Sequence, residues 1–270
     1  MSTIGKKMTS NQQSHPVLFV GAGPGDPELI TVKGQKALQS ADVIVYAGSL
    51  VPEALLDWAD NKTENYNSAA MNLEEIIDVM AKAYQAGKRV VRLHTGDPSL
   101  YGAIFEQMVV LKERSIDYRV IPGVTAAFAA AASLKIEYTI PELSQTLILT
   151  RLAGRTPVPE MENLESLAKH QSSMAIYLSM SLIDQVESIL KRTYGEQAMC
   201  AVAYKVSHPE EQIFHMRVGE LSQKVMDLNI TKHALIIVGG GLAALSSEEG
   251  YRSKLYDKNF SHEYRVLSDE

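Results

Sequence analysis

The chain has 270 residues, 46% of them hydrophobic, so it is long enough for two domains with cores of their own. Its formal net charge of −6 argues against a nucleic-acid-binding or membrane-surface protein, because such proteins usually carry a basic excess. The single cysteine, Cys200, excludes an internal disulfide and suits a reducing compartment. The segment 1–16 lacks the apolar core of a secretory signal and no apolar run would span a bilayer, so we expect a cytoplasmic protein.

The first half of the chain alternates β-branched runs with stretches of helical period. Strands are predicted at 16–21, 42–47, 88–96 and 117–123, and helices near 28–40, 52–59, 73–86 and 102–114. The alanine-rich segment 124–134 is also expected to be a helix, since alanine has the highest helix propensity. This alternation is typical of a mostly parallel sheet with helices on its faces.

A connector at 136–145 leads into a second series of elements. Strands are predicted at 146–151, 172–179, 199–206, 211–218 and 233–240, and helices near 161–170, 182–193 and 219–227. The short link between 199–206 and 211–218 predicts an antiparallel hairpin in a mixed sheet. We therefore expect an α/β protein with domains at 16–142 and 143–245. The tail at 246–270 carries regularly spaced aromatic residues, which favours docking on the body or on a partner subunit over disorder.

The first predicted strand leads into a glycine-rich loop, GAGPGDPELIT at 21–31. Gly21 and Gly23 fit the start of a dinucleotide-binding fingerprint, but the third glycine position holds Asp26. Pro24 and Pro27 have no N–H to donate to a phosphate, and the carboxylate of Asp26 would repel one. An NAD-dependent oxidoreductase is therefore only a remote alternative.

A second loop, HTGDPSLYG at 94–102, also follows a predicted strand and repeats Gly-Asp-Pro. In an open parallel sheet, ligands bind in the crevice outside the carboxyl ends of the strands. Carbonyls, prolines and carboxylates at that place suit a cationic ligand. S-adenosylmethionine is such a ligand, because it carries a sulfonium and an ammonium group and no phosphate. The alternative is that both loops are simply tight turns.

Several stretches spread over nearly the whole chain resemble the tetrapyrrole (corrin/porphyrin) methylase family. They are GAGPGDPELITVKG at 21–34, YAGSLVPE at 46–53, HTGDPSLYGAIFEQM at 94–108, IPGVTAAFAAAA at 121–132, TLILTRLAGRTPVPE at 146–160 and YKVSHPEEQI at 204–213. Within the family, YAGSLVPE combined with GRTPVPE is most similar to the enzymes that methylate a corrin precursor at C11.

This resemblance implies two α/β domains of the tetrapyrrole methylase type, with the methyl donor in the cleft between them, and a homodimer. It also implies methyl transfer from S-adenosylmethionine to C11 of cobalt-precorrin-4, giving cobalt-precorrin-5A and S-adenosylhomocysteine, in anaerobic cobalamin biosynthesis. Cobalt would enter only as part of the substrate. The alternatives are the metal-free precorrin-4 methyltransferase of the aerobic pathway and another tetrapyrrole C-methyltransferase.

The family's donor-binding positions carry over to this sequence motif by motif. In the first domain they are Pro24, Gly96, Asp97, Leu100, Thr125 and Ala126; in the second they are Met180, Ala203, Tyr204 and Ala234. Alignment of an activated methyl group with an electron-rich carbon needs no protein nucleophile, so Asp97 and Tyr101 are only weak catalytic candidates.

The substrate implied by the resemblance carries many carboxylates, so its site should present cations. The preferred candidates are Arg151, Arg155, Lys205 and His94, and further candidates are Lys33, Arg92 and His208. Arginine suits carboxylates because its planar fork binds them bidentately, while an ordinary surface charge is the alternative for each residue. The seven histidines are dispersed without the spacing of metal ligands, so no protein-bound metal is expected.

Overall fold

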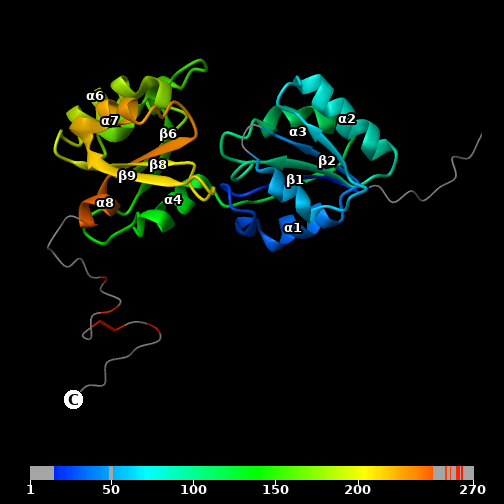
Figure 1. Ribbon diagram of the computed structural model, residues 1–270, viewed down its shortest axis with the longest axis horizontal. Helices are drawn as coiled ribbons and strands as arrows, with labels where there is room; N and C mark the ends of the chain where they lie inside the picture. The colour runs from blue at the N-terminus through cyan, green and yellow to red at the C-terminus, as the bar shows by residue number, and fades with distance from the viewer. Residues whose placement is uncertain are drawn as a thin grey trace, which may run out of the picture. The chain divides into compact units, whose positions relative to one another are not determined.

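The computed structural model describes residues 15–48 and 51–245, together with the isolated positions 253, 256, 260, 261 and 263. Ser49 and Leu50 of the YAGSLVPE stretch, and nearly all of the predicted tail, lie outside the described residues. The chain divides into two compact units, one ending at Thr125 and the other beginning at Ala126. Each unit contains a five-stranded sheet with helices on both faces (Figure 1). No helix in the described part of the chain is long and apolar enough to cross a membrane.

The first unit contains a parallel sheet with strand order β3-β2-β4-β1-β5. Its strands are β1 (Val17–Gly21), β2 (Val43–Tyr46), β3 (Glu64–Asn67), β4 (Val90–His94) and β5 (Tyr118–Ile121). Its helices are α1 (Val32–Gln39), α2 (Leu73–Gln85) and α3 (Ile104–Glu113), with 3₁₀ turns η1 (Pro27–Leu29) and η2 (Glu53–Trp58). The predicted parallel sheet is confirmed, and the helix expected at 52–59 is a 3₁₀ turn.

The helices of the first unit start where the sequence supplies capping side chains. Thr31 precedes α1 and its hydroxyl accepts a hydrogen bond from the N–H of Gly34. Asn72 and Glu75 form a reciprocal capping box at the start of α2. Such side chains satisfy backbone N–H groups that have no partner within the helix.

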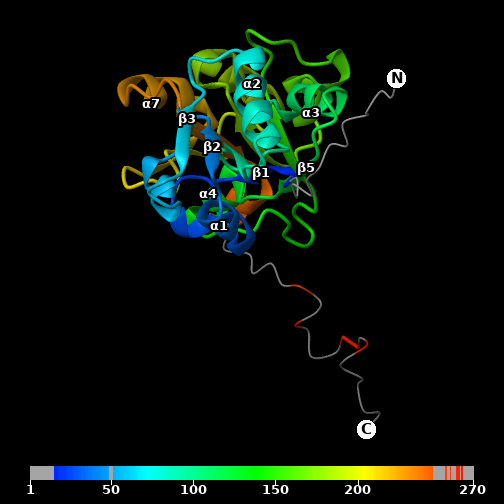
Figure 2. The same ribbon diagram turned by 90° about the vertical axis from the view of Figure 1, so that its right-hand side faces the viewer.

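Helices cover opposite faces of this sheet. Side chains of α2 and α3, such as Met80 and Leu111, pack with Phe19 on one face. Leu38 of α1 packs with Ile44 on the other face. Figure 2 shows α2 and α3 on one side of β1 and α1 on the opposite side. Therefore the chain leaves β1 and β4, which are neighbours in the sheet, toward different faces.

Strand β3 was not predicted from the sequence. It is an edge strand that pairs only with β2 in the described sheet, and all of its residues, Glu64–Asn67, are exposed. An exposed edge strand has no buried face, so it lacks the alternation of apolar and polar residues by which strands are recognised.

The second unit contains a mixed sheet with strand order β6-β7-β10-β8-β9. Its strands are β6 (Leu147–Arg151), β7 (Ser173–Tyr177), β8 (Met199–Tyr204), β9 (Gln212–Arg217) and β10 (Ala234–Val238). Its helices are α4 (Ala126–Leu134), α5 (Leu164–Ala168), α6 (Ile183–Thr193), α7 (Leu221–Asp227) and α8 (Gly240–Leu245), with 3₁₀ turns η3 (Glu160–Glu162), η4 (Met180–Leu182) and η5 (Val218–Glu220). β6 and β7 are parallel, whereas β10 is antiparallel to β7 and β8. The predicted antiparallel hairpin of β8 and β9 is confirmed.

The alanine-rich helix α4 belongs to the second unit, so the division falls earlier than the boundary expected at 142/143. Ala127 and Ala130 are fully buried and pack with Ala201 and Ala203 of the sheet. The backbone of Ala127 is also bonded at both ends, since its N–H donates to Tyr177 Oη at 2.9 Å and its carbonyl accepts from Tyr138 Oη at 2.7 Å. Small side chains on both surfaces let the helix pack closely on the sheet.

Candidate active site

The loops that follow β1 and β4 lie side by side at the carboxyl ends of adjacent parallel strands. The N–H of Ala22 donates to the carbonyl of His94 at 2.7 Å. Gly23 and Gly96 then form an antiparallel bridge, in which the N–H of each donates to the carbonyl of the other, at 3.2 and 2.7 Å. Because the chain leaves the two strands toward opposite faces, this is a topological switch point, where open α/β sheets bind ligands. The prediction that both loops line one place at the sheet edge is confirmed.

A third segment, the turn after β5, packs against both loops through glycine. A Cβ atom on Gly123 would lie 2.2 Å from the carbonyl oxygen of Gly96, and one on Gly21 would lie 2.6 Å from Gly123 Cα. Gly96 also has a φ of 60°, a conformation that glycine adopts without steric cost. These glycines therefore allow three backbone segments to meet.

Asp97 ties two of these segments together. One carboxylate oxygen accepts hydrogen bonds from the N–H and the hydroxyl of Ser99, and the other accepts the N–H of Gly123 at 2.9 Å. Partial burial favours the neutral acid, but these hydrogen bonds outweigh it and hold the pKa of Asp97 below its ordinary value. The contacts of this side chain hold the two loops in place.

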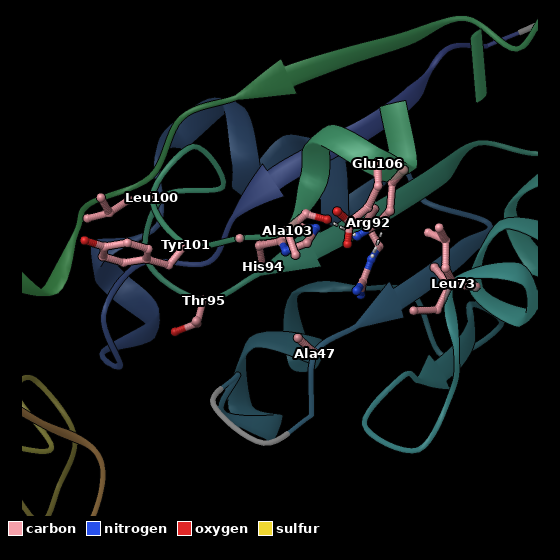
Figure 3. Close-up of a pocket in the computed structure, with 12 residues that line it drawn as sticks. Ala47, Leu73, Arg92, His94, Thr95, Leu100, Tyr101, Ala103 and Glu106 are labelled. Atoms are coloured by element: carbon pink, nitrogen blue, oxygen red, sulfur yellow. Dashed lines mark hydrogen bonds between the residues drawn. The ribbon is translucent and has the colours of Figure 1, made fainter. Parts of the chain in front are cut away.

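A pocket of about 310 Å³ opens beside the second loop, within the first unit (Figure 3). Its lining consists of Ala47, Leu73, Ile76, Arg92, His94, Thr95, Leu100, Tyr101, Gly102, Ala103, Glu106 and Gln107. Tyr101 and Ala103 adopt left-handed backbone conformations, with φ of 56° and 48°. Such conformations cost non-glycine residues about 1–2 kcal/mol and cluster at functional sites.

Two ionisable side chains of β4, Arg92 and His94, border this pocket from the sheet. Each is only 4% exposed. Burial lowers the pKa of Arg92 to about 10, so it is still a cation at neutral pH. Burial, with a smaller contribution from Arg92, lowers the pKa of His94 to about 3, so this imidazole is neutral. His94, predicted from the sequence as a cation for the substrate, therefore carries no charge at neutral pH; this corrects the expected charge, while its contact with the substrate stays a prediction.

The donor-binding candidates predicted for the first domain lie on these three segments, except Ala126, which is the first residue of α4 in the second unit. Pro24 is buried in the first loop, Leu100 lines the pocket, and Thr125 ends the third segment with 8% of its surface exposed. Gly96 and Asp97 hold the loops as described above. The exposed Tyr101 also lines the pocket.

The candidates of the second unit lie where strands of its own sheet begin or end, all on the same side of that sheet's strand ends. Ala234 at the start of β10 is opposite Tyr204 at the end of β8, and Ala203 is opposite Leu235. Met180 is buried in the turn η4 that follows β7 at the same edge. The register thus brings together residues that are distant in sequence.

The basic candidates of the second unit have partners or are exposed. Arg151 donates to the carbonyls of Thr156 and Pro157, at 3.2 and 2.8 Å, and so holds the loop that contains the exposed Arg155. The ammonium of Lys205 lies 3.0 Å from the carboxylate of Glu210. Within the described residues, no group of three His, Cys, Asp or Glu side chains is placed to hold a metal ion.

Sequence patterns alone assign no role to Ser99, Gly123 and Gln107. Ser99 and Gly123 donate to Asp97, and Gln107 accepts a hydrogen bond from Arg92. A Ser two residues after an Asp is a recognisable turn signal. The other two contacts join segments far apart in the chain, which local patterns do not show.

Residues 16–222 match the family model of Tetrapyrrole (Corrin/Porphyrin) Methylases, so the chain belongs to this family of methylases. The family resemblance found in the sequence is therefore confirmed, and the alternative of a dinucleotide-binding glycine loop is not supported. Among individual relatives, the chain is 57% identical over 250 residues to a cobalt-precorrin-4 C(11)-methyltransferase of Methanocaldococcus jannaschii, covering 92% of this chain and 95% of that one. It is 46% identical to a precorrin-4 C(11)-methyltransferase of Pseudomonas aeruginosa, with 92% and 98% covered.

Solved structures agree with this assignment. The X-ray structure of a cobalamin biosynthetic enzyme, cobalt precorrin-4 methyltransferase, aligns with a TM-score of 0.83 at 45% identity, over 87% of this chain and 99% of that one. A uroporphyrin-III C-methyltransferase from Thermus thermophilus, complexed with S-adenosylhomocysteine, aligns with a TM-score of 0.70 at 26% identity, over 85% and 100%. The two-domain α/β fold expected from the sequence is that of this family.

Proposed function

We propose that this chain is an S-adenosylmethionine-dependent methyltransferase that methylates C11 of cobalt-precorrin-4 in anaerobic cobalamin biosynthesis. The observation that carries the proposal is the 57% identity, over 92% of the chain, to a relative named for that reaction. The match of the fold to a cobalt precorrin-4 methyltransferase supports it. The products are cobalt-precorrin-5A and S-adenosylhomocysteine, and cobalt belongs to the substrate.

The methyl donor binds at the loops that meet beyond β1 and β4. A family member with the same fold was solved in complex with S-adenosylhomocysteine. Pro24 and Pro27 have no N–H group to donate to a phosphate, and Asp97 adds a carboxylate. The loops therefore suit a sulfonium and an ammonium group better than a phosphate. The donor-binding candidates are Pro24, Gly96, Asp97, Leu100, Thr125 and Ala126, and, on the sheet edge of the second unit, Met180, Ala203, Tyr204 and Ala234.

The reaction needs alignment more than acid–base or nucleophilic groups. The sulfonium is already an activated electrophile, and an electron-rich corrin carbon attacks its methyl group in line. Holding reactants at near-attack distance supplies about 7–11 kcal/mol of the barrier reduction in favourable cases. In this chain Asp97 contributes by fixing the loops, since both of its oxygens accept hydrogen bonds from backbone or Ser99 donors. Arg151 and Arg155 are candidates for the substrate carboxylates, with Lys205 partly neutralised by Glu210.

A metal-free precorrin-4 is the second candidate acceptor, because a relative at 46% identity is named for that substrate. The test is incubation of the purified chain and S-adenosylmethionine with cobalt-precorrin-4, metal-free precorrin-4 and uroporphyrinogen III in parallel. Mass spectrometry should show one added methyl group, fastest with cobalt-precorrin-4, and NMR should place it at C11. A preference for the metal-free ring would assign the chain to the second candidate, and methylation of uroporphyrinogen III alone would contradict both.

The chain acts as a homodimer in the cytoplasm in this proposal. The absence of a spanning helix among the described residues is compatible with that location. Light scattering coupled to size-exclusion chromatography should give twice the chain mass of 29.7 kDa. A monomer that is active at the same concentration would contradict the dimer.

A further inference from the structure

Arg92 is a buried cation at the wall of the pocket, and some of its hydrogen-bond donors have no partner among the described residues. Its Nε donates to Gln107 Oε1 at 3.1 Å, and its Nη1 donates to the carbonyl of Val45 at 3.2 Å. A guanidinium has five N–H donors, so these contacts use only part of its capacity. Figure 3 shows the side chain of Arg92 between Ala47 and Leu73, which line the same pocket.

The charge of Arg92 has no carboxylate counter-ion within ion-pair distance in the described part of the chain. Both of its hydrogen-bond acceptors are neutral. A buried charge is costly unless a group of opposite charge pairs with it, which favours an anion entering from outside the protein. Glu106 also lines the pocket, but its side chain is exposed at the rim, and the neutral His94 offers no negative charge.

A second polar atom at the pocket wall is unsatisfied. The Nε2 atom of His94 is buried and has no hydrogen-bond partner among the described residues. Buried polar groups in native structures are nearly always paired, so an orphaned one indicates a missing partner. Arg92 and His94 are two residues apart on β4, so they point to the same face of the sheet.

We propose that this pocket binds a carboxylate-bearing side arm of the tetrapyrrole, with the Arg92 guanidinium as its counter-ion. This inference rests on the proposed function, which supplies a substrate rich in such arms. A planar guanidinium matches a carboxylate bidentately. Ala47, Leu73 and Leu100 supply apolar surface for the methylene groups that carry it. A volume of about 310 Å³ suits a substituent and is small for the whole macrocycle.

The direct test is Arg92→Gln, with Arg89→Gln as a matched control. Arg89 lies just before β4 and pairs with Asp42 at an exposed position, so its substitution removes the same charge away from the pocket. Calorimetry measures the Kd of cobalt-precorrin-4 in the presence of S-adenosylhomocysteine, which prevents turnover. Arg92→Gln should weaken tetrapyrrole binding about ten- to hundredfold, and the control should leave it unchanged. The Kd of S-adenosylhomocysteine alone should stay within about twofold.

A second variant avoids disturbing the buried arginine. Leu73 is the first residue of α2, lines the pocket and is 38% exposed, so Leu73→Glu adds a carboxylate at the rim facing Arg92. An acidic residue is favourable at a helix start, so this variant should fold. Leu73→Glu should weaken tetrapyrrole binding by about tenfold and clearly more than the uncharged Leu73→Gln.

An unchanged Kd for cobalt-precorrin-4 in both Arg92→Gln and Leu73→Glu overturns the inference. Loss of S-adenosylhomocysteine binding in Arg92→Gln, without loss of tetrapyrrole binding, also overturns it, because the carboxylate is then that of the donor. A wild-type chain that binds cobalt-precorrin-4 without methylating it contradicts the proposed function and still reports on Arg92. A wild-type chain that binds no tetrapyrrole contradicts both.

Discussion

The two Gly-Asp-Pro turns of the first unit, at 25–27 and 96–98, share a local hydrogen bond and differ in the more distant contacts of their aspartate side chains. Asp26 accepts the N–H of Glu28 at 2.8 Å, and Asp97 accepts the N–H of Ser99 at the same distance. Asp97 also accepts the N–H of Gly123, which lies 26 residues further along the chain. The same tripeptide thus caps the short helix η1 in the first loop and links two strand ends in the second.

This difference shows that a repeated motif does not fix a repeated role. A carboxylate has several acceptor positions, and an Asx turn uses only some of them. Which donor takes the rest depends on the segment that packs beside the loop. Beside the second loop this neighbour is the glycine turn after β5, where the N–H of Gly123 lies within 2.9 Å of Asp97.

The largest effect should come from Gly123→Ala, which adds a methyl group where the second loop packs against the turn after β5. A Cβ there would lie 2.2 Å from the carbonyl oxygen of Gly96, so the backbones must separate. We expect the free energy of unfolding to fall by about 3 kcal/mol, measured by urea denaturation. Gly154→Ala is the control, because its Cβ would meet only Leu182 at an ordinary 3.6 Å. Equal stability of the two variants would contradict the close packing.

The pair Asp97→Ala and Asp26→Ala compares the two turns directly. Removing Asp97 leaves the N–H of Gly123 and the donors of Ser99 without their acceptor, and should cost about 2 kcal/mol. Removing Asp26 takes away the cap of η1 and should cost about 1 kcal/mol. Calorimetric titration with S-adenosylhomocysteine should show a larger loss of affinity for Asp97→Ala. Equal losses in stability and affinity would mean that the two turns have equivalent roles.

Acid should lower the free energy of unfolding through His94, the last residue of the strand that precedes the second loop. Its pKa in the folded chain is about 3, against 6.5 as the ordinary value, so the unfolded chain takes up the proton first. The free energy of unfolding should therefore fall as the pH drops from about 6.5 toward 3, by up to about 1.4 kcal/mol per pH unit from this group.

Comparison of unfolding at pH 7 and pH 5 measures this effect. The variant His94→Asn should lose much of the pH dependence, while His170→Gln, at an exposed position, should keep it. If His94→Asn keeps the full dependence, another group is responsible.

The smallest effect is expected from Ser99→Ala, which removes one hydroxyl donor from Asp97 and keeps the backbone turn. Stability should fall by about 0.5–1 kcal/mol. The pKa of Asp97, followed by carboxyl NMR, should rise, because a donor that stabilises the charged form is lost. A pKa that stays the same would show that Gly123 and the backbone of Ser99 determine it alone.

Sequence patterns predicted the features that depend on local periodicity and on family motifs. The β-branched runs predicted the parallel strands around Gly21 and His94, and the repeated Gly-Asp-Pro placed both loops at strand ends. The patterns failed where the packing of residues distant in sequence determines strand pairing or burial. They missed the exposed strand β3, and they gave the neutral His94 a charge, because its burial comes from packing against residues distant in sequence, such as Phe19 of β1.

The bridge between Gly23 and Gly96 makes the two loops report on each other in amide hydrogen exchange. Each N–H is held by the carbonyl of the other residue, so neither amide can exchange with deuterium until the pair separates. Both amides should therefore show the same protection factor, set by a single opening in which the two loops separate. S-adenosylhomocysteine should slow both to the same degree, so the exchange of these two amides without ligand measures how often the two loops separate.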